Sequence, residues 1–179
     1  MTEDLLADAR RLSDQGFAAR HDHLFLVKRP RAKMPSDKPA PSVEFRTTVV
    51  STRKGSNQLD SDEFALSWVV APIKKRAGNP FPLQISVGRA LNCDIVLRVS
   101  YISKLHAMFA VGPEQTLSLV DNGSANGTSV NHKRLAARTT ATVRSGDWIS
   151  FGAAEFQLLE SSEVYALLRS PGGPPELAR

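Results

Sequence analysis

Between Val87 and Gly152, short apolar runs alternate with polar turns, and this alternation constrains the fold more than any other feature of the chain. The apolar runs are too short for core helices and have the length of β-strands. Glycine, proline, asparagine and aspartate recur between them, as is typical of turns. Many short strands separated by frequent turn signals are typical of a β-sandwich, so we expect an all-β domain.

The strand pattern begins at Glu63. A polar stretch ends there, and apolar residues follow it. We expect strands at residues 64–73, 83–87, 95–97, 106–111, 116–120, 128–130, 134–135, 141–143, 148–151 and 155–159. Asn131-His132 is the expected turn of the hairpin between the two strands on either side of it. After the last strand, residues 165–168 predict a short closing helix, and the tail from Pro171 onward has the composition of a disordered terminus.

Residues 3–18 predict one short amphipathic helix ahead of the sandwich. Thr2 is a suitable N-cap, and Gly16 is a natural stop signal. Leu5 and Leu12 share an apolar face, and a helix this short is only marginally stable unless that face is covered. We expect the face to pack against the domain or another copy of the chain. A helix that binds a partner is the alternative.

The segment between this helix and the sandwich is basic and rich in proline. Residues 28–54 carry 8 basic and 2 acidic side chains, which gives +6, although the whole chain carries a formal net charge of only +5. Residues 24–27 and 43–50 have the pattern of strands. The sequence leaves open whether residues 20–60 extend the sheet. A solvated linker is the favoured interpretation of the basic charge, and nucleic-acid binding is the alternative.

Composition excludes several classes of protein. The 41% hydrophobic and 23% charged content is that of a soluble globular protein. The start of the chain is acidic where a secretory signal would be basic, and no apolar run approaches the roughly 20 residues of a membrane span. Cys93 is the only cysteine, so it forms no internal disulfide and no cysteine-based zinc site. We expect a cytoplasmic protein with Cys93 as a small buried residue.

Four side chains in the predicted turns have the chemistry of a site that binds phosphate on a peptide. Arg89 offers a planar fork of donors that stays charged, and Lys104 adds a point charge. Ser103 can donate both its hydroxyl and its backbone N–H to one anion. Asn126 carries a donor and an acceptor on one amide, which suits the backbone of an extended peptide. Asn126-Gly127 would present this amide at the tip of a loop.

The order of these motifs resembles the forkhead-associated (FHA) domain family over about residues 64–160. The chain contains, in order, Gly88-Arg89, Asp94-Ile-x-Leu, Ile102-Ser-x-x-His, Asp121-x-x-Ser-x-Asn-Gly-Thr-x-Val-Asn, and Gly146-Asp-x-Ile-x-Phe-Gly. Each motif alone is weak evidence, and the five together are strong. The resemblance implies an eleven-stranded β-sandwich that reads phosphothreonine in a flexible peptide.

The resemblance also implies a role for individual residues. Arg89 and Ser103 would bind the phosphate, Lys104 would be a further basic contact, and Asn126 would bind the peptide backbone beside the phosphothreonine. The positions that match the family's loop scaffold are Gly88, His106, Gly127 and Thr128.

Two positions depart from the family pattern. Ala125 stands where some members use a side chain that contacts the ligand, so only its backbone is available here. Asn131-His132 replaces the family's usual Asn-Gly hairpin, which we expect to loosen that turn. His106 could suggest an enzyme, but no nucleophile with an acid partner accompanies it, so we expect it to brace the loops.

The sequence therefore predicts three segments and a non-catalytic adaptor. Residues 1–60 form an N-terminal extension with helix and basic linker, residues 61–162 form the FHA domain, and residues 163–179 form a short helix and flexible tail. We expect no cofactor, metal or membrane. The expected partners are a phosphothreonine-containing protein and a Ser/Thr protein kinase, and self-association stays open. A phosphate-independent interaction scaffold is the main alternative, followed by a nucleic-acid binder acting through residues 28–54.

Overall fold

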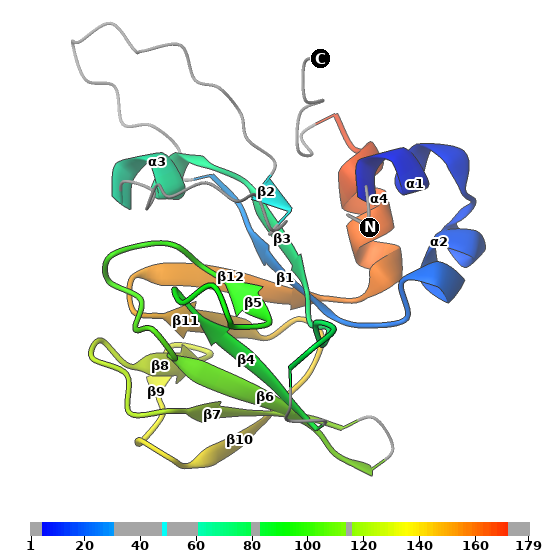
Figure 1. Ribbon diagram of the computed structural model, residues 1–179. Helices are drawn as coiled ribbons and strands as arrows, with labels where there is room; N and C mark the ends of the chain where they lie inside the picture. Colours follow the sequence, from blue (N-terminus) through cyan, green and yellow to red (C-terminus); the bar gives the residue numbers. More distant parts are fainter. Residues whose placement is uncertain (1–4, 31–47, 50–60, 80–82, 114–115, 172–179) are drawn as a thin grey trace, which may run out of the picture.

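A computed structural model describes residues 5–30, 48–49, 61–79, 83–113, 116–171 of the chain. These residues form twelve strands and four helices. The strands make two sheets that face each other; the first, second and fourth helices of the chain lie together beside the larger sheet, and the third helix lies apart from them (Figure 1). The predicted β-sandwich is confirmed, and the described secondary structure is mostly β with four helices in addition.

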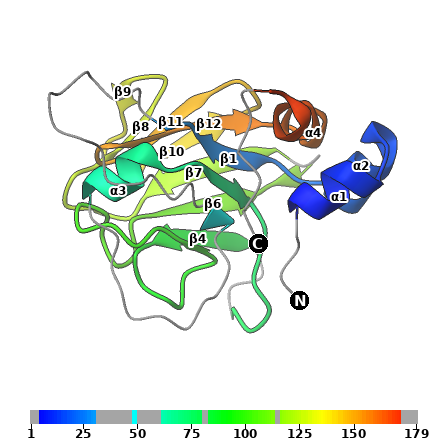
Figure 2. The same ribbon diagram turned by 90° about the horizontal axis from the view of Figure 1, so that it is seen from above.

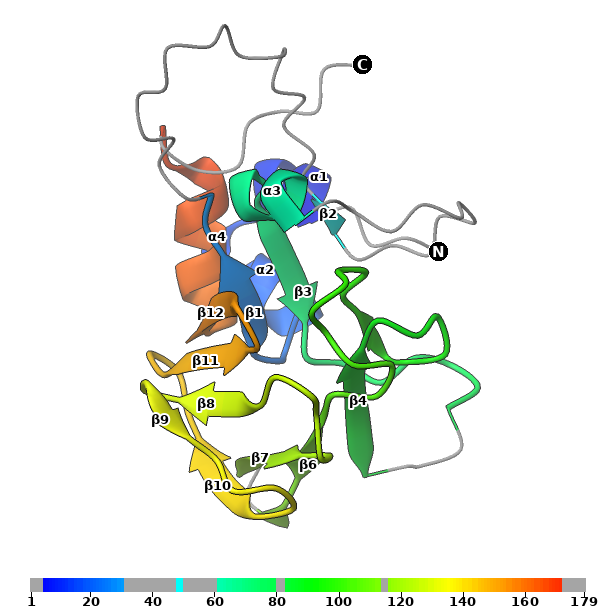
Figure 3. The same cartoon turned by 90° about the vertical axis from the view of Figure 1, so that its left-hand side faces the viewer.

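The larger sheet has seven strands, and its order interleaves the beginning and the end of the chain. The order is β2 (Thr48–Val49), β3 (Val69–Pro72), β1 (Phe25–Lys28), β12 (Ala154–Leu159), β11 (Trp148–Phe151), β8 (Thr128–Val130) and β9 (Lys133–Arg134). Figure 3 shows β1 between β3 and β12. All strand pairings in the seven-stranded sheet are antiparallel except that of β2 with β3, which is parallel.

The second sheet has five strands and comes from the middle of the chain. Its order is β10 (Thr140–Val143), β7 (Leu117–Asp121), β6 (Ala107–Val111), β4 (Gln84–Gly88) and β5 (Ile95–Val96). In β7, buried and partly buried residues alternate strictly, because successive side chains point to opposite faces. The inward side chains of both sheets form the main core, and Phe151 makes edge contacts there with Phe109 and Phe156.

The N-terminal segment contributes strand β1 to the seven-stranded sheet. The sequence had left open whether residues 20–60 extend a sheet. Phe25, Leu26 and Val27 of β1 are at most 2% exposed, and they pair with β12 on one side and β3 on the other. Strands β3 to β12 together with β1 make the expected eleven, and the two-residue β2 is a twelfth. The sheet is therefore continuous through β1, which ends at Lys28, the first residue of the basic segment.

Two short helices replace the single helix predicted for residues 3–18. They are α1 (Leu5–Arg11) and α2 (Asp14–Arg20). Ser13 separates them because its side chain accepts a hydrogen bond from the backbone N–H of Gly16 and thereby caps α2. The prediction of Gly16 as a stop was wrong, since it lies in the first turn of α2.

These helices pack with α4 (Ser161–Arg169) beside β1 and β12, as Figure 2 shows. The predicted closing helix is thus confirmed, and it is longer than residues 165–168. Leu5, Phe17 and Val164 pack with Trp68, which precedes β3, and with residues of the sheet in a second hydrophobic cluster. The apolar face of the N-terminal segment is covered by the domain itself, as the favoured interpretation expected.

The strand predicted over residues 64–73 was wrong in its first half. Residues Ser61–Leu66 form helix α3, and the strand β3 begins only at Val69. Lys28 holds the end of α3, because its Nζ donates hydrogen bonds to the carbonyl oxygens of Ala65 and Ser67. Phe64 is 2% exposed and enters the main core, so α3 covers one edge of the sandwich.

Several expectations concern residues outside the described ranges. These include most of the basic segment 28–54, the predicted strand 43–50 apart from β2, and the tail after Pro171. In the part of the chain that is described, no helix is both long and apolar enough to cross a membrane. The same part holds no group of three or more side chains suited to binding a metal ion.

Candidate binding site at the loop end of the sandwich

The site begins where β4 ends, at Gly88-Arg89. A Cβ at Gly88 would overlap the carbonyl oxygen of Lys104, so only glycine allows these two segments to approach this closely. The backbone N–H of Arg89 donates a hydrogen bond of 3.0 Å to the carbonyl oxygen of Ser103. The backbone therefore fixes Arg89 beside the loop that carries Ser103 and Lys104.

The Arg89 guanidinium has unused donor capacity. Its Nε is buried, and it has no hydrogen-bond partner among the described residues. A buried polar group without a partner costs free energy, and a guanidinium keeps its charge at any working pH. An anion held by Arg89 would remove this cost. Lys104, in the next loop, is exposed and can contribute a second positive charge.

Ser103 is linked to the opposite loop through its side chain. Its Oγ accepts a hydrogen bond of 3.0 Å from the backbone N–H of Ala125. The hydroxyl proton therefore remains available for donation. The backbone N–H of Ser103 instead donates to Nδ1 of His106 at 3.1 Å. Our expectation that this N–H would also serve an anion is not met in this arrangement.

His106 braces the loops from within the protein. It is completely buried, and its Nε2 lies 3.1 Å from the carbonyl oxygen of Gly127. Because Nδ1 accepts from Ser103, Nε2 must carry the proton and donate to Gly127. Burial lowers the pKa of His106 below its ordinary value, so the ring is neutral near pH 7. These contacts explain the expected scaffold role of His106.

Asn126 lies exposed at the tip of the loop between β7 and β8. Its Nδ2 donates a hydrogen bond of 2.7 Å to the carbonyl oxygen of Tyr101. This bond uses one of the two amide protons of the exposed Asn126 and leaves the other proton and the Oδ1 acceptor available to a ligand. A Cβ at Gly152 would lie 3.2 Å from Cβ of Asn126, so the turn between β11 and β12 supports the same side chain.

A buried carboxylate shapes the loop that presents Asn126. Asp121 Oδ1 accepts hydrogen bonds of 2.6 Å from the hydroxyls of Ser124 and Thr128, and Oδ2 accepts 3.0 Å bonds from the backbone of Gly123 and Ser124. Despite its burial, these donors lower the pKa of Asp121 below its ordinary value. Thr128 is completely buried, which explains its position in the predicted scaffold.

The hairpin at Asn131-His132 is well braced, contrary to the expected loosening. Both residues have positive φ, 48° and 64°, as the two central residues of a type I′ turn require. The Asn131 side chain accepts a hydrogen bond from the backbone N–H of Trp148 and donates one to Asp147, each 2.9 Å long. An asparagine tolerates positive φ and here also fastens the turn to β11.

Cys93 is 3% exposed, as predicted, and its Sγ donates a hydrogen bond of 3.3 Å to the carbonyl oxygen of Lys104. Burial raises the pKa of this thiol, so it remains protonated. The thiol therefore supports the Lys104 loop from inside the protein.

Sequence patterns identified the polar side chains of this loop end but missed the residues that position them. Tyr101 and Gly152 support Asn126 through a backbone oxygen and a close approach. The residue type of Tyr101 gives no sign of its contact. Gly152 offers a weak sign, because it is a glycine that follows a strand, and its φ is 59°. Ser124 belongs to the motif that begins at Asp121, but the sequence pattern predicts no positioning role for it.

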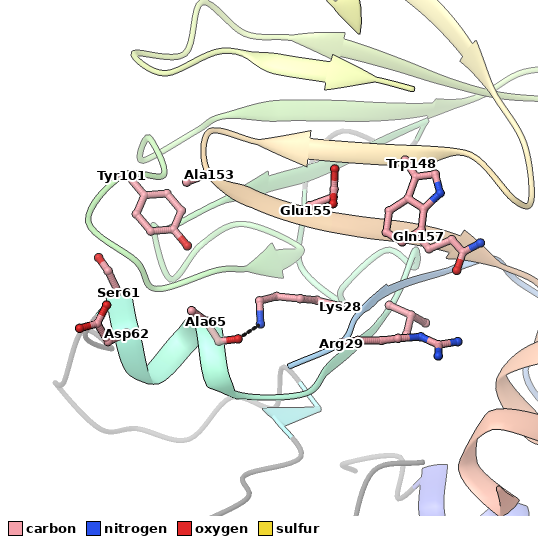
Figure 4. A pocket seen from close by; sticks show the side chains of 11 residues that line it. Lys28, Arg29, Ser61, Asp62, Ala65, Tyr101, Trp148, Ala153, Glu155 and Gln157 are labelled. Carbon is pink, nitrogen blue, oxygen red and sulfur yellow. Dashed lines mark hydrogen bonds between the residues drawn. The ribbon is translucent and has the colours of Figure 1, made fainter. Parts of the chain in front are cut away.

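A cavity of about 330 Å³ lies next to this loop end, between α3 and the outer face of β11 and β12. Figure 4 shows Tyr101 at one end of it, with Ser61 and Asp62 of α3 opposite and Trp148 and Gln157 at the other end. Tyr101 thus connects the cavity to Asn126, which it supports from behind.

The two sheets and the hydrogen-bonded loops at one end define a β-sandwich with braced loops. Residues 85–152 match the family model of the FHA domain, so the chain carries an FHA domain. No curated protein sequence matches the chain.

Solved structures include similar chains of known origin. Mycobacterium tuberculosis EmbR, solved with a low-affinity phosphopeptide, is 29% identical over 44% of this chain and 20% of its own, with a TM-score of 0.39. This chain therefore spans about a fifth of EmbR. The N-terminal FHA domain of Saccharomyces cerevisiae Rad53p, solved with a phosphothreonine peptide, is 23% identical over 46% of this chain and 72% of its own, with a TM-score of 0.41. The FHA domain of CT664 from Chlamydia trachomatis is 22% identical over 51% of this chain and 84% of its own, with a TM-score of 0.43.

Proposed function

We propose that this chain is a non-catalytic adaptor that binds phosphothreonine peptides at the loop end of its sandwich. The observation that carries the proposal is the pair of hydrogen bonds that joins three loops: Arg89 N–H to Ser103 O, and Ala125 N–H to Ser103 Oγ, both 3.0 Å long. These bonds hold the backbone segments that carry Arg89, Ser103 and Asn126 next to one another, which supports a shared site. The match of residues 85–152 to the FHA domain supports the same interpretation.

Phosphate would be bound by three side chains. A phosphothreonine carries nearly two negative charges and three acceptor oxygens. The Arg89 guanidinium has a buried Nε without a partner in the described part of the chain, and the Ser103 hydroxyl has a proton to donate. Lys104 adds an exposed ammonium. Hydrogen bonds to a charged group contribute about 1.5–3 kcal/mol each, so an unphosphorylated peptide would lose most of the affinity.

The peptide backbone would be bound by Asn126. Its remaining amide proton and its Oδ1 can pair with a C=O and an N–H of an extended chain. Tyr101 and Asp121 hold the loop in place before any ligand arrives, so little conformational entropy is lost on binding. Gly88, His106, Gly127 and Thr128 would act only by shaping the loops.

The adaptor would act downstream of a Ser/Thr protein kinase, because only a kinase produces its ligand. The bound phosphothreonine would belong to a partner protein that is recruited in this way. The enzyme interpretation has no support in the site, since His106 is buried and engaged on both nitrogens.

The experiment that tests this proposal is binding of the full chain to an oriented phosphothreonine peptide library, with the unphosphorylated library alongside. We expect selective binding to the phosphorylated library and its loss in Arg89→Ala. Arg144→Ala is the matched control, because Arg144 is an exposed arginine in the turn between β10 and β11, away from the loops of the site. Equal binding of both libraries would overturn the proposal.

A further inference from the structure

The loops that form the candidate site carry an unbalanced charge. We call residues 89–94, 97–106, 122–127 and 135–139 the recognition loops. They contain four basic side chains and one acidic side chain. The basic residues are Arg89, Arg98, Lys104 and Arg138, and the acidic residue is Asp94.

The one carboxylate in these loops is buried and hydrogen-bonded within the protein. Asp94 is 7% exposed. Its oxygens accept hydrogen bonds of 2.9 Å from the backbone N–H of Arg76 and of 2.7 and 2.8 Å from the N–H and hydroxyl of Ser86. Asn79 donates a further bond to Asp94. Asp121, next to the recognition loops, likewise accepts hydrogen bonds from Ser124 and Thr128 in its own loop. A ligand at this face therefore meets exposed positive charge and no exposed carboxylate of these loops.

One more arginine reaches the site from a strand. Arg134 of β9 is exposed, and it pairs with Ser129 across the hairpin. A methyl group added at Gly127 would lie 2.6 Å from Cζ of Arg134, so the guanidinium rests against the residue that follows Asn126. Within the described ranges, no carboxylate forms an ion pair with Arg134. The charge is thus next to the peptide-binding amide and is not neutralised there.

We propose that this site selects phosphothreonine peptides with an acidic side chain close to the phosphothreonine, and that Arg134 binds that side chain across Gly127. This inference rests on the proposed function, since it needs a peptide backbone held by Asn126. Consecutive Cα atoms are about 3.8 Å apart, and an extended peptide advances about 3.3 Å per residue. A guanidinium beside Gly127 therefore reaches side chains within about three residues of the phosphothreonine, on one side of it.

The expected gain is modest, because exposed ion pairs contribute little and salt screens them. A glutamate at the right position should strengthen binding about two- to fivefold at low ionic strength. The gain should shrink when salt is added. A guanidinium can bind a carboxylate through two parallel hydrogen bonds, so the effect should be confined to one or two adjacent peptide positions.

The test is calorimetric titration of the full chain with a set of phosphothreonine peptides that differ only by one glutamate. The reference peptide has glutamine at the three positions before and the three positions after the phosphothreonine. Each test peptide replaces one of these glutamines by glutamate. Arg134→Gln should abolish the gain from glutamate while the reference peptide still binds. Lys133→Gln is the matched control, since this neighbour on β9 is also exposed, carries the same charge and alternates to the other face of the strand.

The outcomes separate this inference from the proposed function. If the phosphorylated reference binds and its unphosphorylated form does not, the proposed function holds, and the glutamate scan decides the inference. A scan without any gain, or a gain that survives in Arg134→Gln, overturns the inference alone. If Lys133→Gln removes the gain equally, general charge and not Arg134 is responsible, and the role of Arg134 is overturned. If no phosphorylated peptide binds better than its unphosphorylated form, both proposals are overturned.

Discussion

Ser103 and Ala125 lie on different loops and are joined by a hydrogen bond of 3.0 Å, from the Ala125 backbone N–H to Oγ of Ser103. This bond directs one lone pair of the hydroxyl to the protein and leaves its proton for another acceptor. It also holds the loop of Asn126 beside Ser103, one of the proposed phosphate ligands. A single hydroxyl thus connects the two halves of the site, one for the phosphate and one for the peptide backbone.

Replacement of Ser103 by alanine should therefore weaken phosphopeptide binding by at least the contribution of one hydrogen bond to the phosphate. A hydrogen bond to a charged phosphate contributes about 1.5–3 kcal/mol, so we expect affinity to fall about 10- to 100-fold. Calorimetric titration with a phosphothreonine peptide measures this loss. Ser118→Ala is the matched control, because Ser118 lies within β7 and its hydroxyl bonds only to the Ala110 carbonyl across the sheet. Equal losses in both variants would contradict the account.

The protonation state of His106 gives a second prediction. Burial lowers the pKa of this ring, so we expect it to stay neutral at pH 6.5, where an ordinary histidine is half protonated. Nitrogen chemical shifts of the ring, followed by NMR from pH 8 to 5, should show a protonated Nε2 and no titration near pH 6.5. A titration midpoint of His106 near pH 6.5 would contradict the hydrogen bonds assigned to this ring.

The same shift predicts how stability depends on pH. Below pH 6.5 the unfolded chain binds a proton at His106 that the folded chain does not yet bind. The contribution of His106 to the free energy of unfolding is thus complete above that pH and is lost as pH falls towards the pKa of the folded state. Asp94 and Asp121, whose pKa values are also lowered, add a further loss below about pH 4. Urea unfolding across this range measures the trend, and rising stability on acidification would contradict it.

Gly127→Ala should destabilise the fold for two separable reasons. Gly127 has a φ of 81°, which costs a residue with a side chain about 1–3 kcal/mol. The added methyl group would also meet the Arg134 guanidinium. Gly123→Ala is the matched control, since its φ of 72° imposes the same strain while no atom lies within 4 Å of the new Cβ.

We expect Gly127→Ala to lower the free energy of unfolding more than Gly123→Ala does. Addition of Arg134→Ala should recover the excess and leave the strain from φ. Urea unfolding of the three variants measures both parts. Equal costs for the two glycines would contradict the close approach of Arg134.

The place of β1 in the sheet predicts which fragments fold. A fragment of residues 61–162 lacks β1, so β3 and β12 lose the strand that lies between them. It would also expose the core around Leu26. We expect this fragment to show no cooperative thermal unfolding, whereas residues 5–171 should unfold in one sharp transition. A cooperative transition in the shorter fragment would show that β1 is dispensable.

Sequence patterns predicted much of the sandwich because its strands follow a strict period. In β12, the buried residues Ala154, Phe156 and Leu158 alternate with the polar residues Glu155 and Gln157, and turns with glycine or asparagine separate many of the strands. The predicted strands from residue 83 onward match the observed ones within a few residues. The family resemblance then supplied candidate residues on loops that have no period.

Where prediction failed, contacts distant in the sequence decide the structure. Residues 64–66 have the apolar character of a strand, but Lys28 caps them as the end of helix α3 from 37 or more residues away. The long apolar face predicted for residues 3–18 is broken by the cap at Ser13. The support that Tyr101 gives to Asn126 passes through a backbone oxygen, which no side-chain pattern reveals.

The central claim is tested most directly by a thermodynamic cycle on two changes: removal of the phosphate from the peptide and Arg89→Ala in the protein. Calorimetric titration of wild type and variant with phosphorylated and unphosphorylated forms of one library-selected peptide gives the four affinities. The account predicts that Arg89→Ala strongly weakens binding of the phosphorylated peptide and leaves binding of the unphosphorylated peptide unchanged. Equal effects of Arg89→Ala on both peptides would show that Arg89 does not bind the phosphate, and would contradict the account.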